Sequence, residues 1–133
     1  MTKIVIFGGE SDIASAIKKI EPNTINISYA ECDVRNSTEI KMVLEMEKPT
    51  AVVNCAGVSN VQLIKDSDIE LWEKEINVNL IGSYRIAREC ANLGIMDMVF
   101  IASVAGKYGK PEHSGYCASK CGTISLVQSL AFE

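Results

Sequence analysis

Apolar residues along the chain follow two different periodicities. Four short stretches are almost continuously apolar or alternate with polar residues, as β-strands do: residues 3–7, 24–28, 51–54 and 96–102. Four longer segments have apolar residues three and four positions apart, as helices do: residues 12–20, 36–48, 68–94 and 114–133. Because parallel strands require crossover helices between them, this alternation predicts an α/β fold with a doubly wound parallel sheet.

Local signals place several helix ends. Asn36 followed by Glu39 has the spacing of a helix-start box, and Gly94 is a predicted C-terminal cap. Gly82 lies inside the third helix, where glycine costs about 1 kcal/mol relative to alanine, so we expect close packing there. The segment after residue 28 leaves little room for a helix before Asn36. One face of the first helix is expected to point inward: Ile13, Ala16, Ile17 and Ile20.

The last predicted helix reaches Glu133 without a terminating glycine or proline, and no strand follows it. The stretch 96–102 is apolar enough for a strand covered on both faces. Without a further strand it would instead be an uncovered apolar edge, which complete proteins avoid. We therefore expect residues 1–133 to form a single domain that is truncated at its C-terminal edge.

The composition is typical of a folded domain rather than a disordered or fibrous chain. Thirteen Lys+Arg and 17 Asp+Glu give a net charge of −4, and 47% of the residues are hydrophobic. A general nucleic-acid or anionic-membrane binder needs a basic patch, which this sequence lacks. We expect small-molecule or protein partners. The start of the chain does not resemble a signal peptide, and no transmembrane span is predicted.

Five cysteines occur without Cys-x-x-Cys spacing, which predicts small buried thiols in a reducing cytoplasm. Cys117 and Cys121 are four residues apart and can share a helix face. No other Cys/His cluster accompanies them, so no metal site is predicted.

The turn after the first strand has the composition of a phosphate-binding turn. Gly8 allows a tight turn, Gly9 is expected to let backbone N–H groups approach an anion, and Ala14 allows the helix to lie close to the strand. The full G-x-G-x-x-G pattern is absent, so an ordinary strand-to-helix turn remains an alternative.

Tyr116 and Lys120 are four residues apart on the last predicted helix and so share one face. The pKa of a free phenol is about 10, and lowering it to about 7 requires roughly 4 kcal/mol of preference for the phenolate. A nearby ammonium in a partly desolvated cleft can supply part of this. Ser103 precedes Tyr116 by 13 residues. Taken alone, the Tyr–Lys spacing also occurs by chance on exposed helices.

Together these motifs resemble the short-chain dehydrogenase/reductase family over nearly the whole chain. The matching positions, in order, are the glycine turn 7–14, Asp33-Val34, Asn54-Cys55-Ala56-Gly57, Asn79 within Val78-Asn79-Leu80-Ile81-Gly82, Ser103, and Tyr116 with Lys120. The resemblance implies a Rossmann-like fold and an oxidoreductase that interconverts a carbonyl and an alcohol. It implies binding of NAD or NADP by Gly8, Gly9, Ser11, Asp12, Ile13, Asp33, Val34, Asn54, Ala56, Gly57, Tyr116 and Lys120.

The resemblance also implies catalytic roles. Tyr116 would be the general acid or base, Lys120 would lower its pKa and hold the nicotinamide ribose, and Ser103 would bind the carbonyl oxygen. Asn79 would hold a water in a proton relay to Lys120. The family commonly forms homo-oligomers through the helices that carry Asn79 and Tyr116.

Departures from the family pattern leave alternatives open. Asp12 replaces a glycine of the turn and is expected to cap the following helix. Neither Ser28 nor Tyr29 decides between NAD and NADP. Glu31 is either an exposed, solvated glutamate or a residue that reaches the ribose 2′-hydroxyl. His113 is either a surface residue or a substrate contact. A non-catalytic dinucleotide-binding module and a sugar-nucleotide epimerase or reductase remain rival functions.

Overall fold

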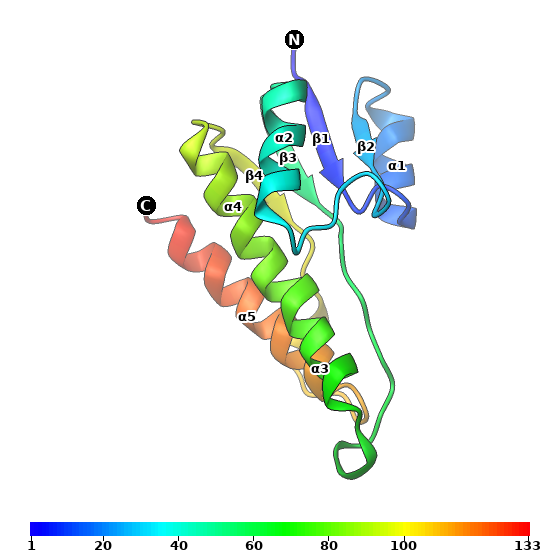
Figure 1. Cartoon of the computed structure of the whole chain (residues 1–133). Helices are drawn as coiled ribbons and strands as arrows, with labels where there is room; N and C mark the ends of the chain where they lie inside the picture. Colours follow the sequence, from blue (N-terminus) through cyan, green and yellow to red (C-terminus); the bar gives the residue numbers. More distant parts are fainter. The chain divides into compact units, whose positions relative to one another are not determined.

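The computed structural model describes all residues from Met1 to Glu133 (Figure 1). Its elements, in chain order, are β1 (Ile4–Phe7), α1 (Asp12–Ile20), β2 (Ile25–Ile27), α2 (Ser37–Glu47), β3 (Ala51–Asn54), the 3₁₀ turn η1 (Ile64–Asp66), α3 (Ile69–Glu75), the π-helical turn η2 (Ile76–Ile81), α4 (Gly82–Asn92), β4 (Asp97–Phe100), the 3₁₀ turn η3 (Val104–Gly106) and α5 (Ser114–Leu130). All four predicted strands and the four predicted helical segments are present.

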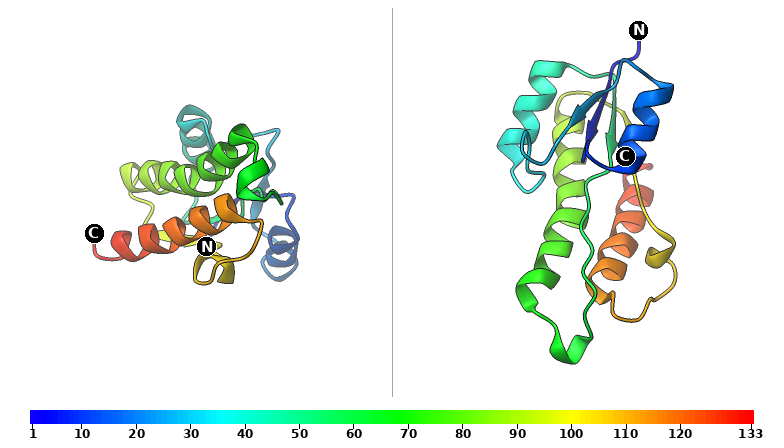
Figure 2. Two further views of the ribbon diagram at one scale, coloured as in Figure 1. Left: turned by 90° about the horizontal axis from the view of Figure 1, so that it is seen from below. Right: turned by 90° about the vertical axis from the view of Figure 1, so that its right-hand side faces the viewer.

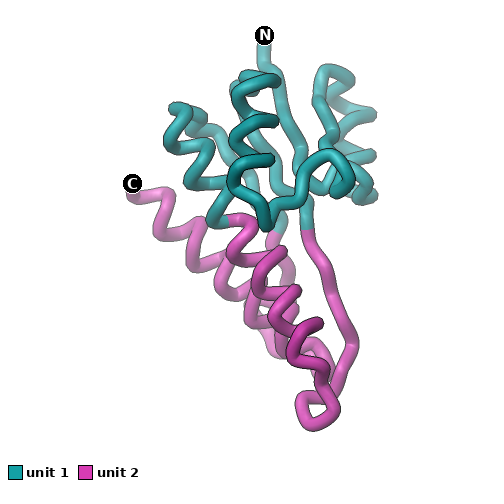
Figure 3. The backbone as a smooth tube through the Cα atoms, in the orientation of Figure 1, with its two compact units in different colours: residues 1–56, 84–101 teal, residues 57–83, 102–133 magenta.

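The chain divides into two compact units, and it passes between them three times (Figure 3). The first unit consists of residues 1–56 and 84–101, and the second of residues 57–83 and 102–133. The first therefore contains every strand, and the second contains α3, η2, η3 and α5.

The first unit is built on a parallel sheet with the strand order β2-β1-β3-β4. All three neighbouring pairs are parallel, and Ile6 of β1 lies opposite Asn26 of β2 and Val53 of β3. Helix α1 covers one face of the sheet, while α2 and α4 lie on the other (Figure 2, right). This arrangement confirms the predicted doubly wound α/β fold.

The packing of α1 differs from the predicted pattern. Ala14 is fully buried with Ile6 and Val53, and Ile17 packs against this cluster. Ile13 and Ile20 are instead 46% and 78% exposed, so the predicted inward face is wrong except for Ile17. The reason is a rotation of the helix: the small side chain of Ala14 permits close approach to the sheet and determines which side faces it.

The link between β2 and α2 contains turns and no helix, as its length predicts. The predicted helix-start box is confirmed: Asn36 Oδ1 accepts hydrogen bonds from the N–H groups of Thr38 and Glu39 at 3.0 and 3.3 Å. The Glu39 carboxylate in turn accepts hydrogen bonds from the side-chain Nδ2 of Asn36 at 3.0 Å and from the backbone N–H of Asp33 at 2.8 Å. The side chain of Glu39 thereby fixes the turn that precedes the helix.

Strand β4 is the outer strand beside β3. Its side chains alternate between exposed and half-buried, and Val99 is 54% exposed. The strand is not covered on both faces; it is the uncovered apolar edge that is expected where no further strand follows.

In the second unit, α5 packs against α3, η2 and η3. The predicted helix 68–94 is present over Ile69–Asn92, but a π-helical turn at Ile76–Ile81 interrupts its regular hydrogen bonding. None of the helices is both long and apolar enough to span a lipid bilayer.

All five cysteines are free thiols, but only Cys32 and Cys90 are buried. Burial raises the pKa of each of these two thiols to about 12. Cys55 and Cys117 are half-buried and Cys121 is exposed, so the prediction that the thiols are buried holds only for the first two.

Candidate active site

In the first unit, the turn after β1 requires glycine at position 8. Gly8 has a φ of +74°, and a Cβ built there would lie 2.4 Å from the Ala56 nitrogen. The end of β3 therefore occupies the space that a side chain would need. The predicted tight turn is confirmed, and close contact with Ala56 is an additional reason for glycine.

Gly9 bonds to the neighbouring strand β2. Its N–H donates to the Ile27 carbonyl at 2.8 Å, and a Cβ there would lie 2.8 Å from the Asn26 carbonyl carbon, from Asn26 Cβ and from the Ile27 nitrogen. The N–H of Gly9 itself is therefore satisfied by β2, and the expectation that Gly9 lets other N–H groups of the turn approach an anion stays a prediction. Gly9 allows the turn to lie against β2.

The start of α1, three residues after Gly9, offers backbone donors to an anion. Ser11, not Asp12, is the N-cap: its hydroxyl oxygen accepts from the Ala14 N–H at 3.1 Å. Asp12 is the first residue of the helix, where a negative side chain is favourable. The N–H groups of Asp12 and Ile13 lie in the first turn, where no intrahelical carbonyl reaches them. These are the donors that a phosphate at this turn would meet.

Two further predicted residues of the first unit have structural partners. Asp33 binds Arg35, with 2.7 Å between Asp33 Oδ2 and the guanidinium, and this contact lowers the pKa of the Asp33 carboxyl. Val34 beside it is buried. Asn54 is also buried, and its Oδ1 accepts from the Ala56 N–H at 3.0 Å, which turns the chain after β3.

In the second unit, Tyr116 and Lys120 lie one turn apart on α5, as their spacing predicts. Lys120 is only 6% exposed, and its Nζ lies 5.7 Å from the centroid of the Tyr116 ring. This distance is within the range of a cation–π contact. The ammonium is thus held beside the phenol in a largely water-excluded position, where its positive charge acts more strongly than in bulk water.

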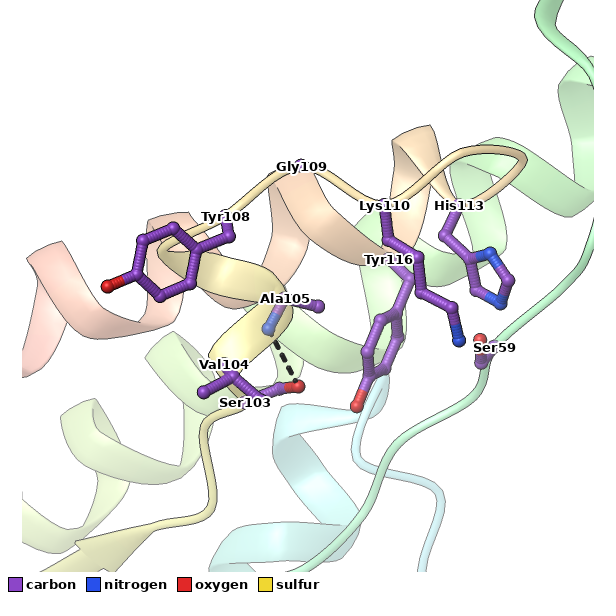
Figure 4. Close-up of a pocket in the computed structure, with 9 residues that line it drawn as sticks. All are labelled: Ser59, Ser103, Val104, Ala105, Tyr108, Gly109, Lys110, His113 and Tyr116. Atoms are coloured by element: carbon purple, nitrogen blue, oxygen red, sulfur yellow. Dashed lines mark hydrogen bonds between the residues drawn. The ribbon is translucent and has the colours of Figure 1, made fainter.

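Ser103 comes next to this pair because η3 packs tightly on α5. Its hydroxyl oxygen accepts from the Ala105 N–H at 3.1 Å and caps η3. A Cβ on Gly106 would lie 2.7 Å from the Lys120 carbonyl carbon, so only glycine permits this approach. In Figure 4 the hydroxyl groups of Ser103 and Tyr116 point into the same space.

Asn79 lies in the π-helical turn and is 1% exposed. Its Nδ2 donates to the Val58 carbonyl at 2.8 Å and to Ser119 Oγ at 3.0 Å, while its Oδ1 accepts from the Val58 N–H at 2.8 Å. A Cβ on Gly57 would lie 3.4 Å from this oxygen and 3.7 Å from Lys120 Nζ. The structure therefore brings predicted residues Gly57, Asn79 and Lys120 together.

Glu75 is a site residue that the sequence analysis missed. It is 1% exposed, its Oε1 accepts from the Asn60 N–H at 2.7 Å, and its Oε2 lies beside Gly115 of α5. Four residues later, Asn79 likewise bonds to Val58 and to Ser119 of α5. Glu75 and Asn79 therefore both lie between α5 and the segment 58–60 and contact each of them. Only its position four residues before Asn79 signals this role in the sequence.

We expect Gly115→Ala to lower the free energy of unfolding by about 1–3 kcal/mol. A Cβ at this position would lie 2.2 Å from Glu75 Oε2, and this buried carboxylate can move only by losing its bond to Asn60. In a Glu75→Ala background the cost should fall, because the blocking oxygen is absent. Urea denaturation of both single variants and the double variant measures this coupling.

Gly109→Ala provides the matched control, since nothing lies within 4 Å of a Cβ there. Additive effects of Glu75→Ala and Gly115→Ala would show that the two residues do not compete for the same space.

A cavity of about 520 Å³ opens beside Tyr116 in the second unit. This volume is in the range of small-molecule sites. His113, for which the sequence left two readings, lies in its wall (Figure 4). The lining residues are Ser59, Ser103, Val104, Ala105, Tyr108, Gly109, Lys110, His113 and Tyr116.

Comparison with known proteins identifies the class. The sequence model of the short chain dehydrogenase family matches residues 1–133, and the chain belongs to this family. It is 35% identical over 112 residues to the 3-oxoacyl-[acyl-carrier-protein] reductase MabA of Mycobacterium tuberculosis, covering 77% of this chain and 45% of the relative. Human (3R)-3-hydroxyacyl-CoA dehydrogenase is 29% identical over 119 residues, covering 81% and 46%.

Solved structures agree with this assignment. A 4-hydroxyisoleucine dehydrogenase complexed with NADH matches with a TM-score of 0.87 and 28% identity, over 99% of this chain and 69% of that one. Thermoplasma acidophilum aldohexose dehydrogenase matches with a TM-score of 0.86 and 26% identity, over 98% and 61%. The chain spans about half the length of the curated relatives that it matches.

Proposed function

We propose that the protein is an NAD(P)-dependent oxidoreductase that interconverts a carbonyl and an alcohol. The observation that carries this proposal is the cavity shared by Ser103 and Tyr116, with the buried ammonium of Lys120 beside the Tyr116 ring. The hydroxyl groups of Ser103 and Tyr116 are directed into one space, so both are placed to hydrogen-bond a single oxygen atom. This arrangement favours catalysis over a binding module without chemistry.

Each residue of the set has a distinct role in the proposed reaction. Tyr116 gives its proton to the carbonyl oxygen in reduction and takes it back in oxidation. Lys120 stabilises the phenolate by its positive charge, and Ser103 donates a hydrogen bond to the oxygen on which negative charge develops. Asn79 donates both amide hydrogens to protein groups, so we assign it a positioning role.

The turn after β1 fits a dinucleotide pyrophosphate. The unreached N–H groups of Asp12 and Ile13 supply donors, while Gly8 and Gly9 keep side chains out of the turn. We propose the other contacts from the family resemblance, with Tyr116 and Lys120 on the nicotinamide ribose and the rest of the dinucleotide against Ser11, Asp33, Val34, Asn54, Ala56 and Gly57. When bound, the nicotinamide supplies or accepts the hydride. An NAD-dependent glycerol dehydrogenase of Listeria innocua, 29% identical over 98% of this chain, supports the assignment.

Charges past the end of β2 favour NAD over NADP. The carboxylates of Glu10 and Glu31 accept hydrogen bonds at 3.0 and 2.7 Å from N–H groups of residues 28–29. The nearby Arg35 is neutralised by Asp33. An acid at this place accepts a hydrogen bond from the 2′-hydroxyl of NAD, whereas a 2′-phosphate needs a basic group.

We expect NADH to bind at least about tenfold more tightly than NADPH, which corresponds to about 1.4 kcal/mol of like-charge repulsion. Nicotinamide fluorescence and the ligand-dependent shift in Tm measure both affinities. Glu31→Gln should narrow the difference, and Glu73→Gln, an exposed glutamate of α3, should leave it unchanged. Tighter binding of NADPH would contradict the preference, and binding of neither by a cooperatively melting protein would contradict the proposed function.

The thiols and the net charge bear on cellular location and binding partners. Free thiols fit a reducing compartment, so we propose a cytoplasmic location. The net charge of −4 favours a small-molecule substrate over nucleic acid or a membrane surface. We propose a homo-oligomer, as the family resemblance implies; Val127 of α5 is an exposed apolar residue that such contact would cover.

A further inference from the structure

Apart from the two tyrosines, Tyr108 and Tyr116, the charged and titratable side chains in the cavity wall are both basic. They are Lys110 and His113, and no aspartate or glutamate lines the cavity. Lys110 belongs to none of the chain's four ion pairs, which involve Lys3, Arg35, Lys41 and Lys65. A cationic wall in a chain of net charge −4 is therefore a local feature of this cavity.

A tight turn brings the two basic residues together. The His113 N–H donates to the Lys110 carbonyl at 3.3 Å, with Pro111 and Glu112 at the centre of the turn. Glu112 has a φ of +62°, a left-handed conformation that is unfavourable for a residue with a side chain. The Glu112 carbonyl accepts from the Gln62 N–H at 2.8 Å, which holds this unfavourable conformation in place.

The ring of His113 is also held in one orientation. Its Nδ1 lies 2.8 Å from the Pro111 carbonyl oxygen, which can only accept, so Nδ1 carries a proton. Nε2 is the nitrogen that remains for a ligand, and it donates a hydrogen bond to an anion when it too carries a proton. In Figure 4, Lys110 and His113 lie on the Ser59 side of Tyr116, and Ser103 lies on the other side.

We propose that Lys110 and His113 form a subsite for an anionic group, a carboxylate or a phosphate, carried by the substrate. The subsite rests on the proposed function, because it assumes that the reacting carbonyl lies at the Ser103 and Tyr116 end of the same cavity. The Ser59 hydroxyl adds a neutral donor beside the two basic groups. An anion there pairs with the Lys110 ammonium, which no acidic side chain of the cavity meets.

His113 is the only histidine in the chain, so its imidazole resonances in NMR report on this site alone. The full chain is titrated at fixed pH with succinate, with inorganic phosphate and with neutral succinamide. We expect saturable shifts with at least one anion and none with succinamide. The tighter-binding anion decides between a carboxylate and a phosphate. Lys110→Gln should raise the dissociation constant at least about fivefold, since it removes a charge-assisted contact.

Lys107→Gln is the matched control, because this exposed lysine belongs to the same loop but does not line the cavity. It should change the dissociation constant by less than about twofold. Equal weakening by both variants, equal shifts with succinamide, or no saturable shift with either anion would overturn the subsite. The titration measures anion binding without cofactor or turnover. Its result therefore tests the subsite separately from the proposed oxidoreductase activity.

Discussion

Tyr116→Phe is expected to lower kcat by roughly 10²–10⁴-fold, the usual contribution of a general acid or base. The change removes the hydroxyl that we propose exchanges a proton with the substrate oxygen. The ring remains, and with it the contact to Lys120 at 5.7 Å, so fold and cofactor affinity should be nearly unchanged. Steady-state kinetics over a panel of carbonyl substrates, together with NADH titration, measure the two effects separately.

Tyr108→Phe is the matched control for this experiment. Tyr108 lines the same cavity and is 71% exposed, but it has no lysine beside its ring. We expect its loss of hydroxyl to leave kcat within a few-fold of the parent protein. Unchanged turnover in Tyr116→Phe, or equal losses in both variants, would contradict the assignment of Tyr116.

Gly8→Ala should lower the free energy of unfolding by about 2–5 kcal/mol, the largest stability effect that we expect. One part is the positive φ of 74°, which costs an alanine about 1–2 kcal/mol. The other is the new Cβ, which would lie 2.4–2.6 Å from backbone atoms of Cys55 and Ala56. These residues directly follow β3, and the Cys55 N–H bonds to the Phe7 carbonyl of β1, so their backbone cannot move without disturbing the sheet. Urea denaturation of the variant measures the loss.

Gly94→Ala separates these two contributions. Gly94 has nearly the same φ, +73°, but nothing lies within 4 Å of a Cβ there. Only the backbone cost of about 1–2 kcal/mol should remain. If Gly8→Ala and Gly94→Ala were equally destabilising, contact with the end of β3 would not be a reason for glycine at position 8.

Local sequence signals predicted the elements of the fold well. The bounds of α1 and β3 agree with the predicted ones, and the helix-start box at Asn36 and Glu39 forms as expected. Such features depend on residues close together in sequence, through side-chain periodicity and capping hydrogen bonds. They therefore require no knowledge of distant contacts.

Predictions failed where a residue's role depends on a distant segment. Ile13 and Ile20 were expected to be buried, but the close approach of Ala14 turns them outward. The spacing of apolar residues over 68–94 also did not indicate the π-helical turn around Asn79.

The sequence by itself determined the α/β alternation and, through family resemblance, predicted the catalytic set Asn79, Ser103, Tyr116 and Lys120. The structure then placed Ser103 and Tyr116 in one cavity and put Lys120 beside the Tyr116 ring. Only the tertiary structure decided that Glu75 is buried against α5 and that Lys110 and His113 share the cavity wall. Periodicity and motifs depend on residues that are close in sequence. Burial and electrostatic environment arise only when separate segments pack together and exclude water.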